Sequence, residues 1–280
     1  MEFTAEIRKA TDPIYQKISQ VVPEIEWSTH APYIHKINKL KKEKNAVILA
    51  HNYQTPEIYH GISDFSADSL ALAVEAAKTK ADIIVMCGVH FMAETAKLMS
   101  PEKKVLLPDM RAGCSLSSSI TGEDVRNLKK KYPGVPVVSY VNTSADVKAE
   151  TDICCTSANA LKIVKSLEVK KVIFLPDDFL AKYVASQTDI EIISWKGTCE
   201  VHEQFNDQEI NEIRKNNPGI KIIAHPECPP DVIKASDFAG STSGMIKYVR
   251  DNQPEKVMMV TECSMSDNVQ IDNPKVKFIR

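Results

Sequence analysis

The sequence predicts an α/β protein built from three small three-layer α/β/α domains with parallel sheets, related by a pseudo-threefold axis, with the site at their central junction. Two observations lead to this prediction. Short apolar runs rich in β-branched residues alternate with helical patterns, which is typical of parallel sheets covered by helices on both faces. The second half of the chain also repeats itself at a constant offset of 85 residues.

The first α/β unit follows a helical region near residues 1–46. The segment "NAVILAHN" predicts a buried strand, and "DSLALAVEAAKTKA" predicts a helix with Asp68 or Ser69 as its N-cap. The segments "DIIVMCG", "FMAETAKLM" and "KKVLLPD" then predict a strand, a helix and a strand. Strands that alternate with helices in this way indicate the doubly wound α/β class. We expect this first domain to occupy residues 47–113.

The repeat defines the other two domains, which we expect at residues 114–198 and 199–280. Sliding the chain by 85 residues places Cys114 on Cys199, "VVSY" on "IIAH" and "VIFLPD" on "VMMVTE", without any gap. A looser upstream copy matches "VILAHNY" to "VVSYVN", "IIVMCGVH" to "ICCTSANA" and "KVLLPD" to "KVIFLPD". Three units are more consistent with a closed cluster than with an open solenoid.

Polar residues follow the first strand of every copy. Ligands of open α/β sheets bind beyond the carboxyl ends of the strands, so three matching strand ends with different chemistry indicate one asymmetric pocket. The plainer alternative is that these residues only cap strands and turns. The residues are His51, Asn52 and Tyr53 in the first copy, Tyr140 and Asn142 in the second, and His225 and Glu227 in the third.

Hydroxyl residues follow the second strand of the copies, where a helix begins. Ser157 and Thr242 occupy equivalent positions, and Ser69 opens a helix in the first copy. Hydroxyls and backbone N–H groups at a helix N-terminus favour anions, which indicates a carboxylate or phosphate substrate. Ordinary N-capping is the alternative explanation.

The cysteines suggest a metal centre. Cys114 and Cys199 align in the repeat, and the same offset places a third counterpart near position 284, beyond Arg280. Three thiolates from pseudo-equivalent loops suit an iron–sulfur cluster, although two small buried residues could also match by chance. Cys199 and His202 do not form a zinc motif by themselves, because the chain has no C-x-x-C pair. The remaining cysteines are assigned to packing (Cys87, Cys154 and Cys155) or to strand ends without repeat partners (Cys228 and Cys263, the latter a local substitute for the third ligand).

The composition excludes several classes of function. The net charge of −2 over 280 residues provides no electrostatic attraction to nucleic acid or to an acidic membrane. No apolar run approaches the length of a membrane span, and the first residues lack the apolar core of a signal peptide. We therefore expect a cytoplasmic protein, in which the seven cysteines stay reduced.

Many motifs in order resemble the quinolinate synthase family, the A proteins of NAD biosynthesis. They include "AHNYQTPEI", "DFSADSL", "GVHFMAETAK", "AGCSL", "YVNTSADVKA", "TSANA", "KGTCEVH", "HPEC" and "GSTSGMI". The resemblance runs from about residue 45 to Arg280. It implies three α/β domains around a central [4Fe–4S] cluster, and a transferase that condenses iminoaspartate with dihydroxyacetone phosphate to quinolinate, losing phosphate and water.

The resemblance also implies roles for individual residues. It makes Cys114 and Cys199 cluster ligands, with the third cysteine expected beyond Arg280, so that the C-terminal end of the site is expected to be incomplete. It places Tyr53 and His202 near the cluster, His202 outside the ligand set. The residues implied for the substrate pocket are His51, Ser69, Tyr140, Val141, Asn142, Ser157, His225, Pro226, Glu227 and Thr242.

The expected mechanism uses one open iron as a Lewis acid. Glu227 is the expected general base, and His225, Tyr53 and His51 are the expected donors or relays, with pKa values tuned towards neutral by burial and by the iron. L-aspartate oxidase or dehydrogenase is a possible transient partner that supplies the imine. Two other functions fit the residues: a zinc hydrolase that uses Cys199, His202, His225 and Glu227, and a non-catalytic protein that binds a small anion.

Overall fold

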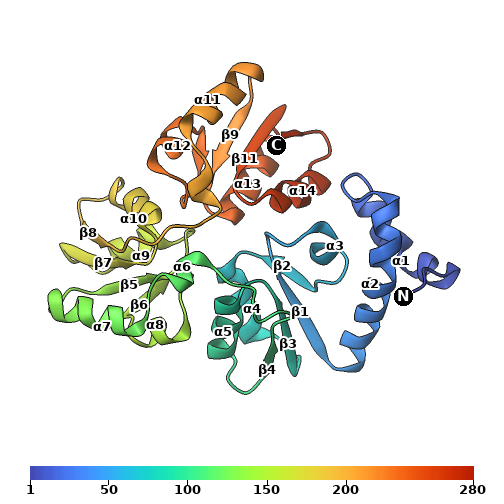
Figure 1. Ribbon diagram of the computed structural model, residues 1–280, viewed down its shortest axis with the longest axis horizontal. Coiled ribbons are helices and arrows are strands. Elements are labelled where there is room, and N and C mark those ends of the chain that lie inside the picture. The colour runs from blue at the N-terminus through green and yellow to red at the C-terminus, as the bar shows by residue number, and fades with distance from the viewer. The chain divides into compact units, whose positions relative to one another are not determined.

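The computed structural model describes residues 1–280, and its first sheet follows two N-terminal helices (Figure 1). The helices are α1 (Ala5–Ile18) and α2 (Glu24–Glu43). The strands are β1 (Ala46–His51), β2 (Phe65–Ala67), β3 (Ile83–Cys87) and β4 (Lys104–Leu106), in the parallel order β2-β1-β3-β4. The connecting helices are α3 (Pro56–Tyr59), α4 (Ser69–Lys78) and α5 (His90–Met99). Asp68 caps α4 by accepting from the amide of Ala71, one of the two N-caps predicted.

The second sheet repeats this order as β6-β5-β7-β8. Its strands are β5 (Val137–Tyr140), β6 (Ile153–Cys155), β7 (Lys171–Leu175) and β8 (Glu191–Ser194), all parallel. The associated helices are α6 (Ser115–Ser118), α7 (Gly122–Lys131), α8 (Ala145–Ala149), α9 (Ala160–Ser166) and α10 (Asp178–Ala185). Helices α7 and α8 lie on one face of the sheet and α9 and α10 on the other (Figure 1).

The third sheet has the order β10-β9-β11-β12. Its strands are β9 (Lys221–Ala224), β10 (Phe238–Ala239), β11 (Lys256–Val260) and β12 (Lys277–Ile279), again parallel. The associated helices are η1 (His202–Gln204), α11 (Asp207–Asn216), α12 (Pro230–Ala235), α13 (Thr242–Asn252) and α14 (Cys263–Asp272). Three parallel four-stranded sheets confirm the predicted fold class.

The contacts divide the chain into two compact units. Unit 1 contains residues 1–110 and 263–275, and unit 2 contains residues 111–262 and 276–280. Unit 1 therefore holds the first sheet, the N-terminal helices and α14, whereas unit 2 holds the second and third sheets. Because this division groups two sheets together, the three predicted domain ranges and the central junction of three domains stay predictions.

The core of unit 1 shows how the sequence of β1 builds a layered structure. Successive side chains of a strand point to opposite faces. Ile48 and Ala50 pack with Trp27, Ala31 and other residues of the N-terminal helices. Leu49 packs in a separate cluster with residues of α4 and α5. Helices therefore cover both faces of the first sheet, as the continuous apolar run predicted.

An aspartate at the same place in each copy fixes the register of the repeat. Its Oδ2 accepts from the amide of a first-strand residue: Asp64 from Ile48 at 2.8 Å, Asp152 from Val137 at 2.7 Å, and Asp237 from Ile222 at 2.8 Å. The amide of each aspartate donates back to the carbonyl of the same strand residue. These three pairs make His51, Tyr140 and His225 equivalent, and likewise Tyr53, Asn142 and Glu227.

The same register corrects the predicted matching within the first copy. The second strand of that copy is β2, "FSA", and not "IIVMCGVH". Strand β3 occupies the place of β7, and β4 occupies the place of β8. The error arose because β2 has only three residues and is partly exposed, so it lacks the apolar run by which strands are recognised.

The repeat in unit 2 extends from strands to turns and helices. Helices α7 and α11 begin at Gly122 and Asp207, 85 residues apart, and both are followed by a glycine with positive φ, Gly134 at 77° and Gly219 at 81°. Only glycine adopts this left-handed conformation without strain.

None of the helices in residues 1–280 is both long and apolar enough to cross a membrane.

Candidate active site

The turn after β9 carries two of the predicted site residues. His225 and Glu227 are buried, with 3% and 4% of their surfaces exposed. The amide of Glu227 donates to Nδ1 of His225 at 3.3 Å, and the amide of Cys228 donates to the carbonyl of His225 at 3.0 Å. This turn, which contains Pro226, holds both side chains at the carboxyl end of the strand. An Nδ1 that accepts a hydrogen bond leaves the ring proton on Nε2.

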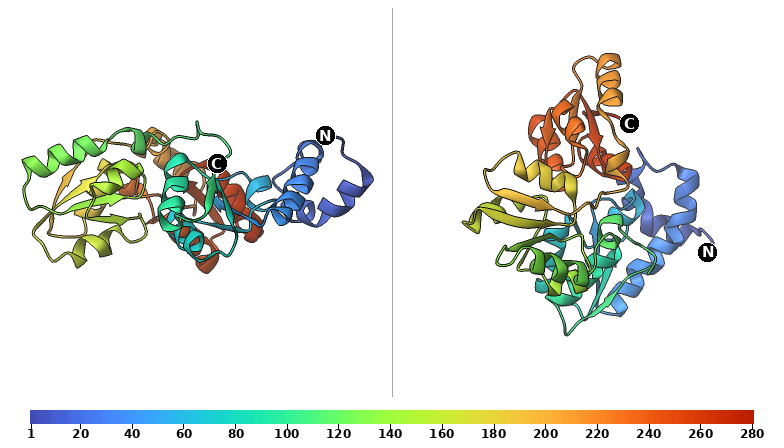
Figure 2. Two further views of the ribbon diagram at one scale, coloured as in Figure 1. Left: turned by 90° about the horizontal axis from the view of Figure 1, so that it is seen from below. Right: turned by 60° about the vertical axis from the view of Figure 1, so that its left-hand side comes forward.

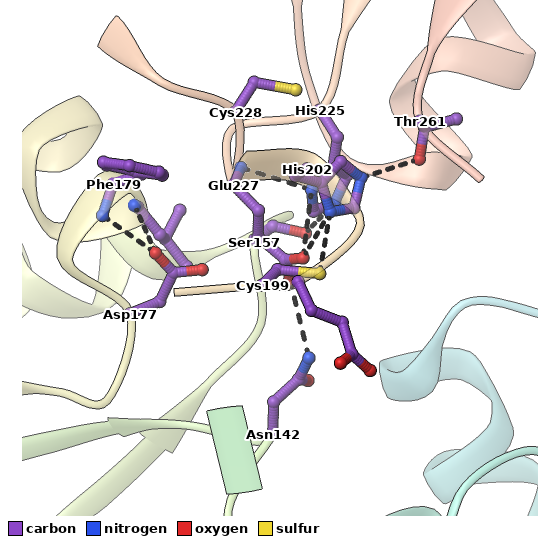
Figure 3. Close-up of polar contacts among 12 residues, drawn as sticks. Asn142, Ser157, Asp177, Phe179, Cys199, His202, His225, Glu227, Cys228 and Thr261 are labelled. Atoms are coloured by element: carbon purple, nitrogen blue, oxygen red, sulfur yellow. Dashed lines mark hydrogen bonds and ion pairs between the residues drawn. The ribbon is translucent and has the colours of Figure 1, made fainter. Parts of the chain in front are cut away.

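Glu227 receives hydrogen bonds from three residues in two other segments of unit 2. The hydroxyl of Tyr140, at the end of β5, donates to Oε1 at 2.6 Å, and Nδ2 of Asn142 lies 3.5 Å from the same oxygen. Nδ1 of His202 lies 2.9 Å from Oε2. The carboxylate therefore lies where the second and third sheets meet (Figure 3). The structure brings together five residues from distant positions in the predicted site: Tyr140, Asn142, His202, His225 and Glu227.

The surroundings of Glu227 keep it ionised. Burial raises the pKa of the carboxyl, but the nearby His225, the hydrogen bond and charge of His202, and the Tyr140 hydroxyl together hold that pKa well below its usual range. In the chain alone, two imidazoles and a phenol therefore stabilise the carboxylate more than burial destabilises it. The tuning of the site towards neutral by burial and by the iron stays a prediction.

His202 connects Glu227 to Cys199. Its Nδ1 lies 3.1 Å from Sγ of Cys199, and its Nε2 lies 2.9 Å from Oγ1 of Thr261. The ring is 1% exposed and is stacked on that of His225, with centroids 5.0 Å apart. A hydrogen bond at Nε2 fixes the orientation of the ring, so that Nδ1 points at the thiol and the carboxylate (Figure 3).

Ser115 holds the two repeat-matched cysteine loops together. Its hydroxyl donates to the carbonyl of Thr198 at 2.9 Å and accepts from the amide of Glu200 at 3.0 Å. Both residues that flank Cys199 are therefore hydrogen-bonded to Ser115. Ser115 directly follows Cys114, which precedes α6. Both cysteines are partly exposed. Sequence reasoning missed Ser115, although its place next to a matched cysteine was a usable signal.

The two thiols are compatible with a metal cluster. Burial raises the pKa of Cys114 to about 11, and the Glu227 carboxylate adds to this. Burial and Glu227 also raise the pKa of Cys199 above its usual range. Such thiols stay protonated unless a cationic centre stabilises the thiolates. Two accessible sulfurs on linked loops therefore provide soft ligands that suit an iron–sulfur cluster.

The three hydroxyl residues predicted near helix starts, Ser69, Ser157 and Thr242, do not cap the helices beside them. Ser157 lies three residues before α9, and its Oγ is 3.2 Å from Nε2 of His225. Thr242 and Ser69 are the first residues of α13 and α4. Their neighbours, Ser241 and Asp68, provide the capping side chains. The three hydroxyls are thus not the capping groups of these helices.

His51 and Tyr53 show in unit 1 the arrangement that His225 and Glu227 show in unit 2. The amide of Tyr53 donates to Nδ1 of His51 at 3.3 Å, and the two rings make a T-shaped contact with centroids 4.7 Å apart. These residues and Ser69 belong to unit 1. A single pocket that combines them with Glu227 stays a prediction, as do the roles of Val141 and Pro226.

Asp177 is a buried acid that sequence reasoning did not select. It follows β7, is 0% exposed, and accepts from the amides of Phe179 and Leu180 through Oδ1. Its Oδ2 has no hydrogen-bond partner. Burial and the charge of Glu227 raise its pKa well above the usual range. The repeat offered a signal, because its counterpart 85 residues on is also acidic, Glu262.

Three parallel α/β repeats, with a carboxylate, imidazoles and thiols at the strand ends, define an α/β enzyme with a candidate metal centre. Comparison with known proteins identifies the family. The family model described as "Quinolinate synthetase A protein" matches residues 35–280. Proteins named quinolinate synthase are 60% identical in Sinorhizobium fredii, over 100% of this chain and 78% of that protein, and 58% identical in Caulobacter vibrioides, over 99% and 77%. The chain belongs to the quinolinate synthase family of enzymes.

Proposed function

We propose that this chain is a quinolinate synthase that condenses iminoaspartate with dihydroxyacetone phosphate and releases phosphate and water. The observation that carries the proposal is the 58–60% identity, along essentially the whole chain, to proteins that bear this name. The site supports it, because a reaction that removes protons and water needs the acid–base groups that surround Glu227.

Glu227 is proposed as the general base. It is ionised in the free protein and is contacted by the Tyr140 hydroxyl and by His202. A substrate group that displaces the Tyr140 hydroxyl would raise the pKa of Glu227 and so strengthen it as a base. His225 is positioned to donate a proton from Nε2, which faces Ser157. We propose His51 and Tyr53 as further donors or relays on the substrate.

Polar groups in unit 2 are proposed to bind the substrate. Oδ1 of Asn142 is buried without a hydrogen-bond partner in the free protein, and a buried acceptor of this kind favours a ligand that donates to it. The hydroxyls of Ser157 and Thr242 are proposed to bind the carboxylate or phosphate oxygens, together with Ser69. Val141 and Pro226 are proposed as pocket residues because they lie between polar ones at the strand ends.

Cys114 and Cys199 are proposed as ligands of a [4Fe–4S] cluster. The repeat places the third equivalent position near residue 284, outside residues 1–280. When bound, the cluster supplies an iron with an open position as a Lewis acid. Free thiols of this kind persist in a reducing compartment, so we propose that the enzyme works in the cytoplasm, where L-aspartate oxidase or dehydrogenase supplies the unstable imine.

The test of the proposed base is the variant Glu227→Gln. An amide keeps the shape of the side chain but cannot accept the proton, so we expect turnover to fall by roughly 100-fold or more, while the cluster absorbance of anaerobically reconstituted protein stays unchanged. Turnover of iminoaspartate with dihydroxyacetone phosphate by the unmodified chain is the reference. A Glu227→Gln rate near that of the unmodified chain would show that another group is the base.

Metal analysis distinguishes the proposed cluster from zinc hydrolase chemistry at the same residues. We expect iron and acid-labile sulfide in protein reconstituted under anaerobic conditions. Zinc without sulfide in protein that is active as prepared would overturn the cluster. Absence of any turnover in cluster-loaded protein would instead favour a protein that only binds a small anion.

A further inference from the structure

Three ligand atoms of different chemistry converge within unit 2. The sulfur of Cys199, a ring nitrogen of His202 and a carboxylate oxygen of Glu227 all lie within 4.8 Å of one another. Nδ1 of His202 is the central atom of the group, 3.1 Å from the sulfur and 2.9 Å from Oε2 of Glu227. His202 and Glu227 are almost completely buried, and Cys199 is partly exposed. The group is therefore mostly enclosed, and only its cysteine is partly exposed to solvent.

Two of the three separations are close to those of a tetrahedral zinc site, and the third, from the sulfur to the carboxylate oxygen, is at most 4.8 Å. Zinc binds cysteine sulfur at about 2.3 Å, histidine nitrogen at about 2.0–2.1 Å and carboxylate oxygen at about 2.0–2.2 Å. Tetrahedral angles then separate sulfur from nitrogen by about 3.6 Å and nitrogen from oxygen by about 3.4 Å. The observed 3.1 and 2.9 Å need an expansion of only about 0.5 Å.

Thr261 provides the outer contact that metal-binding histidines typically have. Nε2 of His202 lies 2.9 Å from Oγ1 of Thr261, so Nδ1 is the nitrogen that faces the other two ligands. Nδ1 also lies 2.9 Å from the carboxylate, so the nitrogen and the oxygen face each other across the position that a metal ion would take. Metal binding to ligands of these types releases protons.

We propose that Cys199, His202 and Glu227 form a mononuclear site for a divalent transition metal such as Zn²⁺ in the cluster-free protein. Three protein ligands leave a fourth position of the tetrahedron open to water or to a small anion. The site uses Cys199 but not Cys114. The next step rests on the proposed cluster function. Because both metal centres use Cys199, the mononuclear metal and the cluster exclude each other, and Zn²⁺ blocks cluster assembly.

Cobalt provides a direct test, because a thiolate ligand to Co²⁺ produces a charge-transfer band in the near ultraviolet and tetrahedral coordination produces intense visible bands. The full chain is stripped of metal under anaerobic conditions and titrated with Co²⁺. We expect one ion per chain, both sets of bands, and their loss on addition of Zn²⁺. A spectrum without the sulfur band, or one that is octahedral, overturns the proposal.

Two variants separate the mononuclear site from the cluster. His202→Gln should weaken Co²⁺ binding more than 10-fold, since it removes a ligand, while the thiols of the cluster remain. Cys114→Ser should abolish cluster assembly and leave the Co²⁺ affinity within about twofold, because Cys114 is outside the proposed triad. Loss of Co²⁺ binding in Cys114→Ser, or unchanged binding in His202→Gln, overturns the triad. Failure of cluster assembly in protein that also contains the third ligand position near residue 284, with normal Co²⁺ binding, counts against the proposed function alone.

The same preparation tests two further points: the contact between Thr261 and His202, and the competition between Zn²⁺ and the cluster. Thr261→Val removes the group that orients His202, and we expect Co²⁺ affinity to fall by about 10-fold. Preloading the unmodified chain with one equivalent of Zn²⁺ should suppress cluster absorbance on reconstitution, and the suppression should be relieved in His202→Gln. Equal cluster formation with and without Zn²⁺ would overturn the mutual exclusion.

Discussion

The Tyr140 hydroxyl donates a 2.6 Å hydrogen bond to Oε1 of Glu227, across 87 residues of sequence. Tyr140 ends β5 and Glu227 follows β9, so this bond joins the carboxyl ends of strands in two different sheets. Tyr140 and Glu227 occupy different positions of the repeated turn, because Tyr140 is equivalent to His225 and Asn142 is equivalent to Glu227. Sequence divergence between the copies has thus placed a donor opposite an acceptor.

Tyr140→Phe should weaken catalysis in a pH-dependent way. The hydroxyl is one of the groups that lower the pKa of Glu227, so its removal raises that pKa and moves the acid limb of kcat/KM to higher pH. A hydrogen bond to a charged group is worth about 1.5–3 kcal/mol, so we expect kcat/KM on the acid limb to fall roughly tenfold or more, and to change less at higher pH. Tyr183→Phe is the control, because Tyr183 donates to the carbonyl of Ala239 instead. Equal pH profiles for both variants would contradict this role of Tyr140.

Ser115→Ala should loosen the segment that carries Cys199. The variant loses two hydrogen bonds, to the carbonyl of Thr198 and from the amide of Glu200, and we expect a loss of about 1–2 kcal/mol in the free energy of unfolding by urea. Iodoacetamide should alkylate Cys199 faster in the cluster-free variant, as measured by peptide mapping. Ser166→Ala is the control, because its exposed hydroxyl bonds only within its own helix. An unchanged alkylation rate would show that Ser115 does not restrain the loop.

Asp237→Asn should show how much stability comes from the aspartates that accept a hydrogen bond from the first strand of each copy. Burial raises the pKa of Asp237, but the Ile222 amide, Arg214 and Lys221 outweigh it and lower that pKa below 3.8. Its contribution is therefore present above pH 3.8 and is lost as the pH falls through the folded-state pKa. We expect Asp237→Asn to cost about 1–3 kcal/mol at pH 7, and less near pH 3. The exposed Asp189→Asn is the control, and a pH-independent loss in Asp237→Asn would contradict the charge argument.

Asp177→Asn should have the opposite pH dependence. Because the pKa of Asp177 is raised above 3.8 by burial and by Glu227, its contribution is present below pH 3.8 and is lost as the pH rises through the folded-state pKa. An amide keeps the acceptor for Phe179 and Leu180 but carries no buried charge. We expect the variant to match or exceed the unmodified chain in stability at pH 8. A marked loss at pH 8, measured by urea unfolding, would show that the carboxylate itself is required.

The repeat in the sequence predicted the parts of the fold that depend on local pattern. Strands β7 and β11 lie at residues 171–175 and 256–260, in the register that the 85-residue offset requires. The pattern could not predict that Tyr140 pairs with Glu227, because this contact depends on how two sheets pack. It also could not predict that His202 lies between Cys199 and Glu227. The short strand β2 was missed because three partly exposed residues carry too little apolar signal.

Asn268 positions the loop that carries Tyr53. It lies on α14, is 3% exposed, and its Nδ2 lies 3.3 Å from the carbonyl of Asn52 and 2.7 Å from that of Gln54. These two carbonyls flank Tyr53, whose amide in turn donates to His51. A single side chain more than 200 residues away in the sequence therefore fixes the backbone on both sides of a proposed proton donor.

Asn268→Asp tests this role with almost no change in shape. A carboxylate cannot donate, and it would face two carbonyl oxygens, so the loop must move away. We expect kcat to fall by roughly 10–100-fold, in line with small misplacements of catalytic groups, with the cluster spectrum unchanged. Asn273→Asp is the matched control, because Nδ2 of Asn273 donates to the carbonyl of Val269 on α14 rather than to the Tyr53 loop. If both variants lose stability equally and keep kcat, Asn268 only stabilises the fold and does not position Tyr53.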